Sequence, residues 1–327
     1  MIHYLLQKAA QYLIVIVLAL TLNFVLPRLM PGDPLQLLAG DDVGRLDAAQ
    51  RQVVLQHYGL DRPVWDQFVI YMGGALRADF GYSFHEQRPV SQILLERLPW
   101  TVALVGLSIL FSTSLGVAAG SLAAWRRGRW LDGAGLTLFV FMDSLPAFWL
   151  GMLLIVLFAV QLRWFPLFGA LSFTQELSGA DLAIDVIKHL VLPVATLTLV
   201  STGGMFLITR YALLGVLGEE FILTARAKGL RESRVLFKHA LRRAALPIAT
   251  AVLLRLGQLV GGATVVETTF TYPGLGRLMY QSVLSRDYPV LQGAFFWLAV
   301  CMIAANAFAD VLYPFLDPRL RLNAVRR

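Results

Sequence analysis

Long stretches without charged side chains alternate with shorter charged segments along this chain. Four runs contain no Asp, Glu, Lys or Arg, and two more contain one charged residue each; the six runs are 9–27, 101–125, 133–162, 190–209, 244–266 and 288–309. About 20 helical residues are enough to cross the hydrocarbon core of a bilayer. The pattern therefore predicts an all-α polytopic membrane protein with six transmembrane helices. Six buried helices in a soluble chain of 327 residues would leave too little polar surface to cover them.

The composition also indicates a protein that lies in a lipid bilayer rather than in water. Hydrophobic residues make up 57% of the chain and charged residues 15%, whereas soluble domains carry about 25% charged residues. The single cysteine, Cys301, allows neither a disulfide framework nor a cysteine-based metal site within one chain. The first apolar run exceeds the usual length of a signal-peptide core, and Asn23 to Pro27 is no small-residue cleavage site, so we expect a retained first helix.

Lys and Arg residues are distributed unequally between the two sides of the predicted membrane. With the N-terminus inside, the inside segments hold 16 of them, whereas the longer outside segments hold 11. Because an excess of Lys and Arg marks cytoplasmic loops, both termini are expected in the cytoplasm. The net charge of +7 is then explained by topology near anionic lipid headgroups, and no nucleic-acid partner is needed.

The runs divide the chain into four predicted parts. These are an N-terminal transmembrane helix (1–30), a periplasmic insertion (31–99), a five-helix core (100–316) with a cytoplasmic loop at 210–246, and a cytoplasmic tail (317–327). Within the insertion, residues 47–57, 64–76 and 90–97 have helical patterns between Gly and Pro residues. We expect the insertion to pack on the outer mouth.

The cytoplasmic loop contains eight Lys and Arg residues between Arg210 and Arg243. Glu219 and Glu220 favour the start of a helix, since acidic groups stabilise the positive end of its dipole. Gly229 offers a left-handed stop and Ser233 a cap for a second helix. The loop is therefore predicted to form two short helices joined by a sharp bend, although a loop that only fixes topology would also be basic.

Two charged residues fall inside predicted spans. Counted from the cytoplasmic ends of their runs at about 1.5 Å per residue, Asp143 and Arg255 lie at depths of roughly 15 and 12 Å. Ionisable groups at such depths usually mark function or pairing. We hypothesise that they pair or face a water-filled path, with Gln258 in the same group, and a purely structural pair is an equal alternative. Pro146 is expected to kink its helix, and Gly203-Gly204 to allow close helix approach or bending.

Catalytic signatures are missing from the sequence. It contains no GxxxxGK[ST] phosphate loop, no HExxH and no GxSxG. The five histidines are scattered, and His189 is read as an interfacial residue rather than a metal ligand. We therefore expect a chain that is not an enzyme, hydrolyses no ATP itself and binds no metal or cofactor.

The cytoplasmic loop carries a resemblance to a known family. Thr224-Ala225-Arg226-Ala227-Lys228-Gly229-Leu230, followed by residues 239–242 and Leu246-Pro247, resembles the coupling loop of ATP-binding-cassette importer permeases, in particular the dipeptide/oligopeptide/nickel branch. Further matching stretches lie along nearly the whole chain, at residues 31–34, 58–63, 79–83, 144–151, 261–262, 267, 273–276, 286–289 and 316–319. One departure is Leu223-Thr224-Ala225, where the general pattern has Glu-Ala-Ala.

The resemblance implies a type I importer-permease bundle in the bacterial cytoplasmic (inner) membrane. Its implied partners are a second homologous permease subunit, two ATPase subunits or domains that use ATP and Mg, and an external substrate-binding protein. The implied ATPase-coupling residues are Thr224, Ala225, Arg226, Ala227, Lys228, Gly229, Leu230, His239 and Leu241.

The cargo stays open between two kinds of substrate. Di- or oligopeptides carried by alternating access are expected first, and nickel or a metal chelate is the alternative within the family. A stand-alone secondary transporter or channel is the alternative from another class. A proton-driven carrier would need several carboxylates within its spans, and the sequence offers Asp143, with Asp310 near the inner edge.

Overall fold

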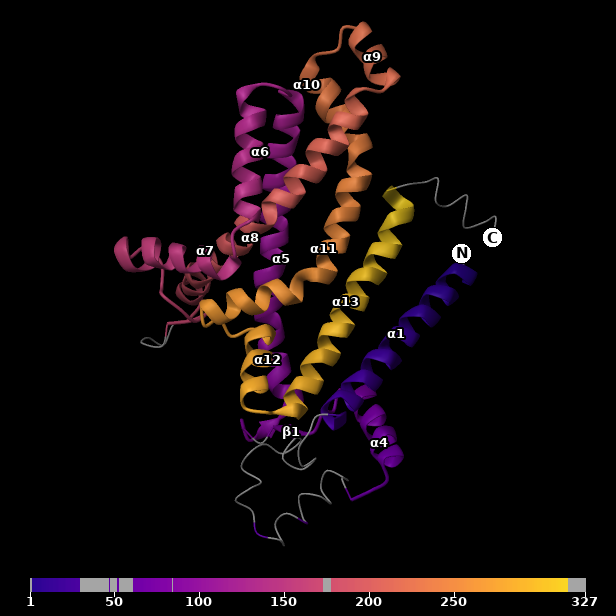
Figure 1. The fold of residues 1–327 in the computed structure, drawn as a ribbon, viewed down its shortest axis with the longest axis vertical. Helices are drawn as coiled ribbons and strands as arrows, with labels where there is room; N and C mark the ends of the chain where they lie inside the picture. The colour runs from indigo at the N-terminus through magenta and orange to yellow at the C-terminus, as the bar shows by residue number, and fades with distance from the viewer. Residues whose placement is uncertain are drawn as a thin grey trace. The chain divides into compact units, whose positions relative to one another are not determined.

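The computed structural model describes residues 2–29, 61–83, 85–172 and 178–316, together with Asp47 and Gln52. In this part all regular secondary structure is helical except for one short hairpin (Figure 1). The α-helices are α1 (Ile2–Leu29), α4 (Val64–Leu76), α5 (Val90–Trp125), α6 (Trp130–Asp143), α7 (Ala147–Leu154), α8 (Ala180–Leu217), α9 (Glu220–Ala227), α10 (Glu232–Arg234), α11 (Leu241–Thr269), α12 (Leu275–Leu284) and α13 (Tyr288–Leu316). Two π-helical segments, η2 (Ile155–Gln161) and η3 (Val235–Ala240), continue α7 and precede α11.

Helices occupy all six apolar runs of the sequence. Among the described residues, α1, α5, α8 and α13 are long and apolar enough to cross a membrane, and α6 with α7 and η2 makes a fifth crossing if this bent pair is one span. Helix α11 covers the run at 244–266 but does not meet the same criterion within the described residues. The all-α class is confirmed, and the count of six spans stays a prediction.

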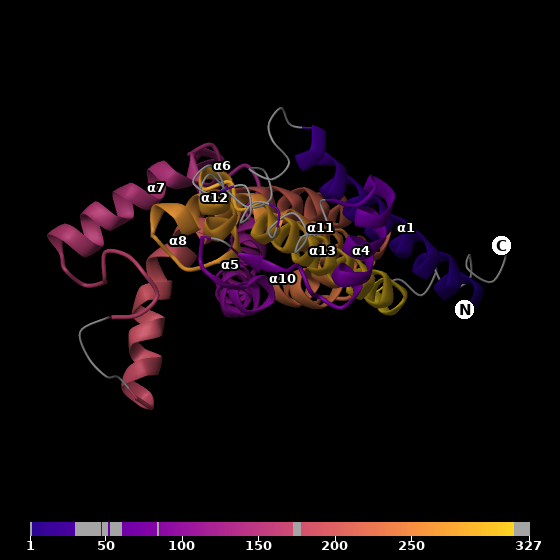
Figure 2. The same ribbon diagram turned by 90° about the horizontal axis from the view of Figure 1, so that it is seen from below.

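The third run is broken in the middle. Helix α6 ends at Asp143, Pro146 caps α7 from an extended conformation, and the two helices are bent by 100°. Figures 1 and 2 show α7 turning away from α6. Proline has no N–H for a helical hydrogen bond and disfavours helical geometry in the residue before it. The predicted kink at Pro146 is therefore confirmed, as a complete break.

The chain divides into two compact units, residues 1–101 with 273–304 and residues 102–272 with 305–327. In the second unit, α8 packs against α6, α7 and α11. A stretch of α5 approaches α8 closely, because a Cβ on Gly116 would lie 2.7 Å from Cβ of Met205, and one on Gly120 would lie 2.9 Å from Cβ of Thr209. Glycines four residues apart let helix backbones approach in this way in membranes.

The first unit packs α4, α12 and the adjoining parts of α1, α5 and α13 around a core of Leu20, Ala75, Phe80, Val90, Ile93, Leu94, Leu275, Leu278, Val290 and Ala294. Polar contacts tie α1 to its neighbours: the Asn23 amide donates to the Tyr71 hydroxyl at 3.1 Å and to the Gln292 carbonyl at 2.7 Å. Helix α4 has the predicted bounds 64–76. The predicted helix at 47–57 and the tail at 317–327 lie outside the described residues, apart from Asp47 and Gln52.

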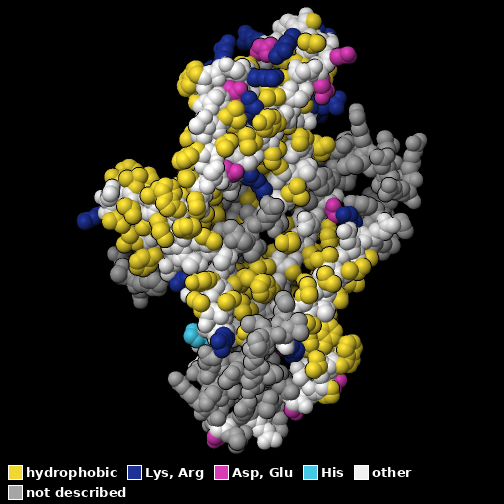
Figure 3. Space-filling view, viewed as in Figure 1, with side chains coloured by type: hydrophobic (Ala, Val, Ile, Leu, Met, Phe, Trp, Pro, Cys, Tyr) yellow, Lys and Arg dark blue, Asp and Glu magenta, His cyan; other side chains and the backbone are white. Residues whose placement is uncertain are grey.

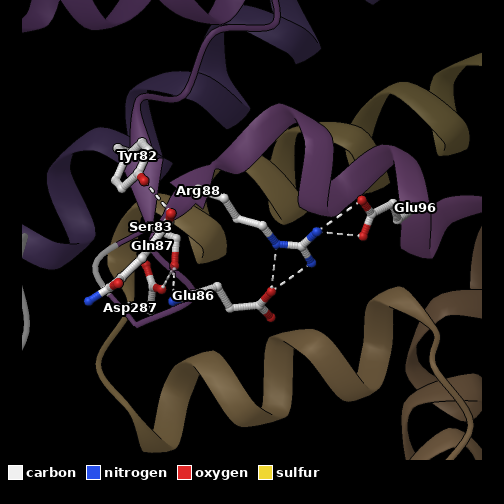
Figure 4. A network of polar contacts seen from close by, with 7 residues as sticks. All are labelled: Tyr82, Ser83, Glu86, Gln87, Arg88, Glu96 and Asp287. Atoms are coloured by element: carbon white, nitrogen blue, oxygen red, sulfur yellow. Dashed lines mark hydrogen bonds and ion pairs between the residues drawn. The ribbon is translucent and has the colours of Figure 1, made fainter.

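A small polar network fixes the hairpin of the first unit (Figure 4). Strand β1 (Tyr82–Ser83) pairs antiparallel with β2 (Arg88–Pro89). The buried Ser83 hydroxyl donates to Oδ2 of Asp287 at 2.5 Å. The Arg88 guanidinium lies between Glu86 and Glu96, which raises its pKa. Burial is the largest influence on Asp287 and raises the pKa of its carboxyl, although the Ser83 hydroxyl lowers it.

Candidate coupling bend and intramembrane charges

Helix α9 ends in a left-handed turn at Gly229. The Leu230 N–H donates to the Ala225 carbonyl at 3.4 Å, and the Gly229 N–H to the Arg226 carbonyl at 2.9 Å. These two bonds form a Schellman motif, which requires a positive φ at its turning residue, and Gly229 has φ +73°. The left-handed stop predicted at Gly229 is confirmed.

One side of the bend is anchored in the core of the second unit. Ile222 and Ala225 of α9 are buried together with Val235, Leu236 and Ala240 of η3. Leu213 of α8 and Ala244 and Ile248 of α11 belong to the same cluster. Since α9 and η3 share one core with α8 and α11, the bend is a packed element rather than a solvated loop.

The other side of the bend is exposed. Thr224, Arg226, Lys228 and Gly229 face solvent, as does Leu223 with 59% of its surface accessible. Figure 3 shows basic and acidic side chains gathered at the end of this unit that carries α9 and α10. The Arg226 Nε donates to Oε1 of Glu232 at 2.8 Å, which bridges the two helices across the turn. A partner could therefore contact a charged ridge on the exposed side of α9, while the buried side of the same helix packs on the core of the second unit.

The second half of the bend differs from the prediction. Arg231, not Ser233, is the N-cap residue of α10, and Ser233 lies inside this short helix without a capping hydrogen bond, so that detail was wrong. The chain then continues as the π-helical segment η3 directly into α11. His239 and Leu241 are half-buried at this junction, and Leu241 packs on the shared core.

The intramembrane charges flank the glycine pair of α8. A Cβ on Gly203 would lie 2.6 Å from Cβ of Asp143, and one on Gly204 would lie 2.5 Å from Nη2 of Arg255. The Arg255 Nη1 donates to the Ser201 carbonyl at 2.5 Å. The described contacts include no ion pair within 4.0 Å between Asp143 and Arg255, although the two charges interact electrostatically. Gln258 lies in α11, with its side chain outside the described residues, and the role of all three residues stays a prediction.

A buried ion pair escaped the sequence analysis. The Arg210 Nε donates to Oδ1 of Asp132 at 2.7 Å and its Nη2 to Oδ2 at 2.8 Å, which joins α6 to α8. The Gly128 N–H adds a third bond to the same carboxylate at 3.0 Å. Arg210 was counted with the basic cytoplasmic loop in the sequence analysis. One signal in the sequence could have suggested this pair: Asp132 and Arg210 have opposite charges, and both lie at the predicted cytoplasmic ends of apolar runs.

His189 is the tenth residue of α8 and is buried, and its Nδ1 lies 2.8 Å from the Asp185 carbonyl. The Asp185 carboxylate in turn accepts bonds from the backbone N–H and the hydroxyl of Ser172, both at 2.7 Å. Within the described part of the chain, no three His, Cys, Asp or Glu side chains are arranged as metal ligands.

The sequence matches one transport family along most of its length. Residues 116–322 match the binding-protein-dependent transport system inner membrane component, and residues 1–105 match the N-terminal part of such membrane components. The chain belongs to this family. It is thereby a permease component of ABC transporters and a multi-pass protein of the inner membrane. This confirms the resemblance to the peptide branch of the importer permeases.

Two relatives of this permease are similar over nearly their whole length. The glutathione transport system permease protein GsiC of Escherichia coli (strain K12) is 38% identical over 321 residues, which cover 98% of this chain and 99% of that protein. A putative peptide transport system permease protein of Brucella abortus (strain 2308) is 36% identical over 318 residues, with 97% and 98% covered.

A solved structure confirms the permease fold. A chain of the methionine ABC transporter MetNI, in an inward-facing conformation, superposes with a TM-score of 0.55 at 19% identity, covering 69% of this chain and 97% of that one. At this identity the likeness concerns the fold alone.

Proposed function

We propose that this permease is the membrane-spanning subunit of an ATP-driven importer for short peptides, and that separate ATPase subunits move it through the bend formed by α9, α10 and η3. The observation that carries the proposal is the two-sided construction of this bend. Its exposed ridge offers contacts to a partner, and its buried side shares a core with α8 and α11. Neither side alone would transmit a movement.

The coupling follows from packing. Close-packed interiors transmit displacement because their side chains have little room to yield. A displacement of α9 by an ATPase subunit would therefore carry α8 and α11 with it through Ile222, Ala225 and Leu236. Such a displacement alternates the access of a path between the two sides of the membrane. ATP and Mg act in the partner subunits, and this chain binds no cofactor.

The assembly contains more than this chain. A second homologous permease subunit, two ATPase subunits or domains and an external substrate-binding protein complete it, with both termini of this chain in the cytoplasm. The uneven distribution of Lys and Arg supports this orientation. The family description, which names a binding-protein-dependent transport system, supports the external partner.

Peptides are proposed as cargo because of the names of the relatives. One of them is a glutathione transport permease, and glutathione is itself a small peptide; another is a putative peptide transport permease. Nickel or a metal chelate would require a different external binding protein, and no described contact in this chain favours it over a peptide.

The coupling is tested at Gly229. A Cβ there would meet no atom within 4 Å, so a substitution acts through backbone conformation rather than through a clash. A non-glycine residue in the left-handed region costs about 1–2 kcal/mol, and a β-branched residue costs more. We expect Gly229→Val to reach the membrane but to lose at least about 5- to 30-fold in affinity for the ATPase subunits. ATP-dependent peptide uptake should fall with it.

The matched control is Gly179→Val. Gly179 also has a positive φ and open space around it, but it caps the opposite end of α8. This variant should co-purify with the ATPase subunits as the wild type does. Equal retention of the ATPase subunits by both variants, with normal uptake, would contradict coupling through the bend.

A further inference from the structure

A carboxylate and a guanidinium lie against adjacent residues of one membrane helix. Asp143 ends α6 and contacts Gly203, whereas Arg255 comes from α11 and contacts Gly204. Any larger residue at either position would collide with the charged side chain. Because the two glycines have no side chains, they leave room against α8 for two opposite charges, which belong to different helices.

Neither charge is fully neutralised within the chain. Among the described residues, the Ser201 carbonyl is the one hydrogen-bond acceptor of the Arg255 guanidinium, which has five N–H donors. The Asp143 carboxylate is exposed and accepts no hydrogen bond from the described part of the chain. An exposed carboxylate at membrane depth is costly against lipid, so it faces the bundle interior or a water-filled cavity. The surface that bears Asp143 is therefore expected to face a water-filled cavity or another protein surface rather than lipid.

The backbone beside Asp143 points to the same conclusion. Residues 144–146 are not helical, and they form the 100° break between α6 and α7. Interrupted helical backbone within a membrane is tolerated where it is buried in protein or lines a water-filled cavity. Transporters commonly place their substrate sites at such discontinuous helices. Charge and backbone thus mark one place in this unit, at the break beside α8.

We propose that Asp143 and Arg255 form a binding site for a dipolar substrate, in which Asp143 binds the terminal ammonium group of a short peptide and Arg255 binds its terminal carboxylate. This inference deepens the proposed function and rests on it. The guanidinium matches a carboxylate because its N–H groups form a planar fork. The two glycines keep both groups close to one helix, and because adjacent helical residues are separated by only about 1.5 Å along the axis, a ligand spanning the two groups would cross α8 rather than lie along it.

Permease complexes in lipid nanodiscs, without the external binding protein, provide the test. Equilibrium dialysis measures the affinity for labelled trialanine, for its N-acetyl form and for its C-terminal amide. The variants are Asp143→Asn and Arg255→Gln, and Asp143→Glu and Arg255→Lys are the controls that keep each charge. The same complexes with the binding protein are assayed for ATP-dependent trialanine uptake in liposomes.

The expected results are opposite for the two ends of the peptide. Asp143→Asn should weaken binding of trialanine and its amide about tenfold or more while leaving the N-acetyl form unchanged. Arg255→Gln should weaken trialanine and its N-acetyl form and leave the amide unchanged. The charge-keeping variants should retain most of the affinity for all three.

Equal loss of affinity for all three peptides in both variants would overturn the site, because it would indicate only a structural role. Failure of the wild type to prefer trialanine over its blocked forms would also overturn it. If the wild type binds no peptide but still takes it up with ATP, this site is wrong and the importer function stands. If ATP-dependent uptake itself is missing in the wild type, the proposed function fails.

Discussion

The buried pair of Asp132 and Arg210 makes the sharpest prediction about stability. The two side chains are 6% and 10% exposed, and two hydrogen bonds of 2.7 and 2.8 Å join them. Asp132→Asn removes the negative charge and leaves the guanidinium of Arg210 buried without compensation. Breaking a buried pair in this way costs about 3–5 kcal/mol. The perturbation therefore acts on the junction of α6 and α8, away from the exposed ridge of the bend.

Thermal unfolding of the purified permease complex measures this cost. For domains of 150–250 residues, each kcal/mol shifts the melting temperature by about 2–4 °C, so Asp132→Asn should lower it by roughly 6–20 °C. The control is Glu232→Gln, which breaks the exposed pair with Arg226, whose side chains are 49% and 40% exposed. Exposed pairs contribute about 0–1 kcal/mol, and this variant should shift the midpoint by no more than about 4 °C.

A double variant separates pairing from packing. Asp132→Asn with Arg210→Met leaves no isolated buried charge, so its loss should be smaller than the sum of the two single losses. Additive losses, or a shift for Asp132→Asn no larger than that for Glu232→Gln, would refute the claim that a desolvated charge pair holds α6 against α8.

Two further predictions concern the close contact at Gly203 of α8 and the hydrogen bond between Ser83 and Asp287. Gly203→Ala should lower the melting temperature because its Cβ would collide with the Phe139 carbonyl and with Asp143 of α6, and the overpacking costs about 1–3 kcal/mol. Gly215→Ala on the same helix, where a Cβ meets nothing within 4 Å, should be neutral or stabilising, and equal losses would contradict the close contact. Burial raises the pKa of Asp287 above its ordinary value of 3.8, so the folded state binds this proton more tightly than the unfolded chain and the resulting stability is lost as the pH rises through the raised pKa. The melting temperature of the wild type relative to Asp287→Asn should therefore fall as the pH rises above 3.8, and a constant difference would speak against a raised pKa.

Local signals in the sequence were sufficient for elements whose cause is local. The bounds of α4, the left-handed residue at Gly229 and the break at Pro146 all follow from residues that are adjacent in the chain. The spans themselves extend beyond their charge-free runs. Helix α8 begins at Ala180, ten residues before the run at 190–209, and Ser172 binds the carboxylate of Asp185 within this charged first part of the helix.

Long-range pairing was outside the reach of the sequence. Arg210 was counted with the basic loop because a charge beside an apolar run reads as a topology signal, and nothing local identifies its partner 78 positions away. Ser233 was assigned as a cap by a local rule. The short helix α10 instead begins at Glu232, and this residue forms an ion pair with Arg226 of α9. The contacts of Gly203 with Asp143 and of Gly204 with Arg255 likewise depend on α6 and α11, which only the fold brings to α8.

The contacts of α8 indicate where the permease can deform as it works. Arg210 binds it to α6 through a buried ion pair, and Leu213 binds it to the core of the bend, where any relative movement would expose apolar or charged groups. Close contacts at Gly203 and Gly204 also join α8 to α6 and α11, and the Arg255 Nη1 donates to the Ser201 carbonyl there. Residues 144–146 form no regular helix, and the backbone hydrogen bonds around them are few, among them those from the Ser144 N–H to the Val140 carbonyl and from the Leu150 N–H to the Pro146 carbonyl, both at 3.1 Å. Rotation at that point therefore breaks fewer helical hydrogen bonds than rotation inside a helix. A push on the bend would therefore move α6, α8, α9 and α11 as one body and concentrate relative motion at the break between α6 and α7, beside Asp143.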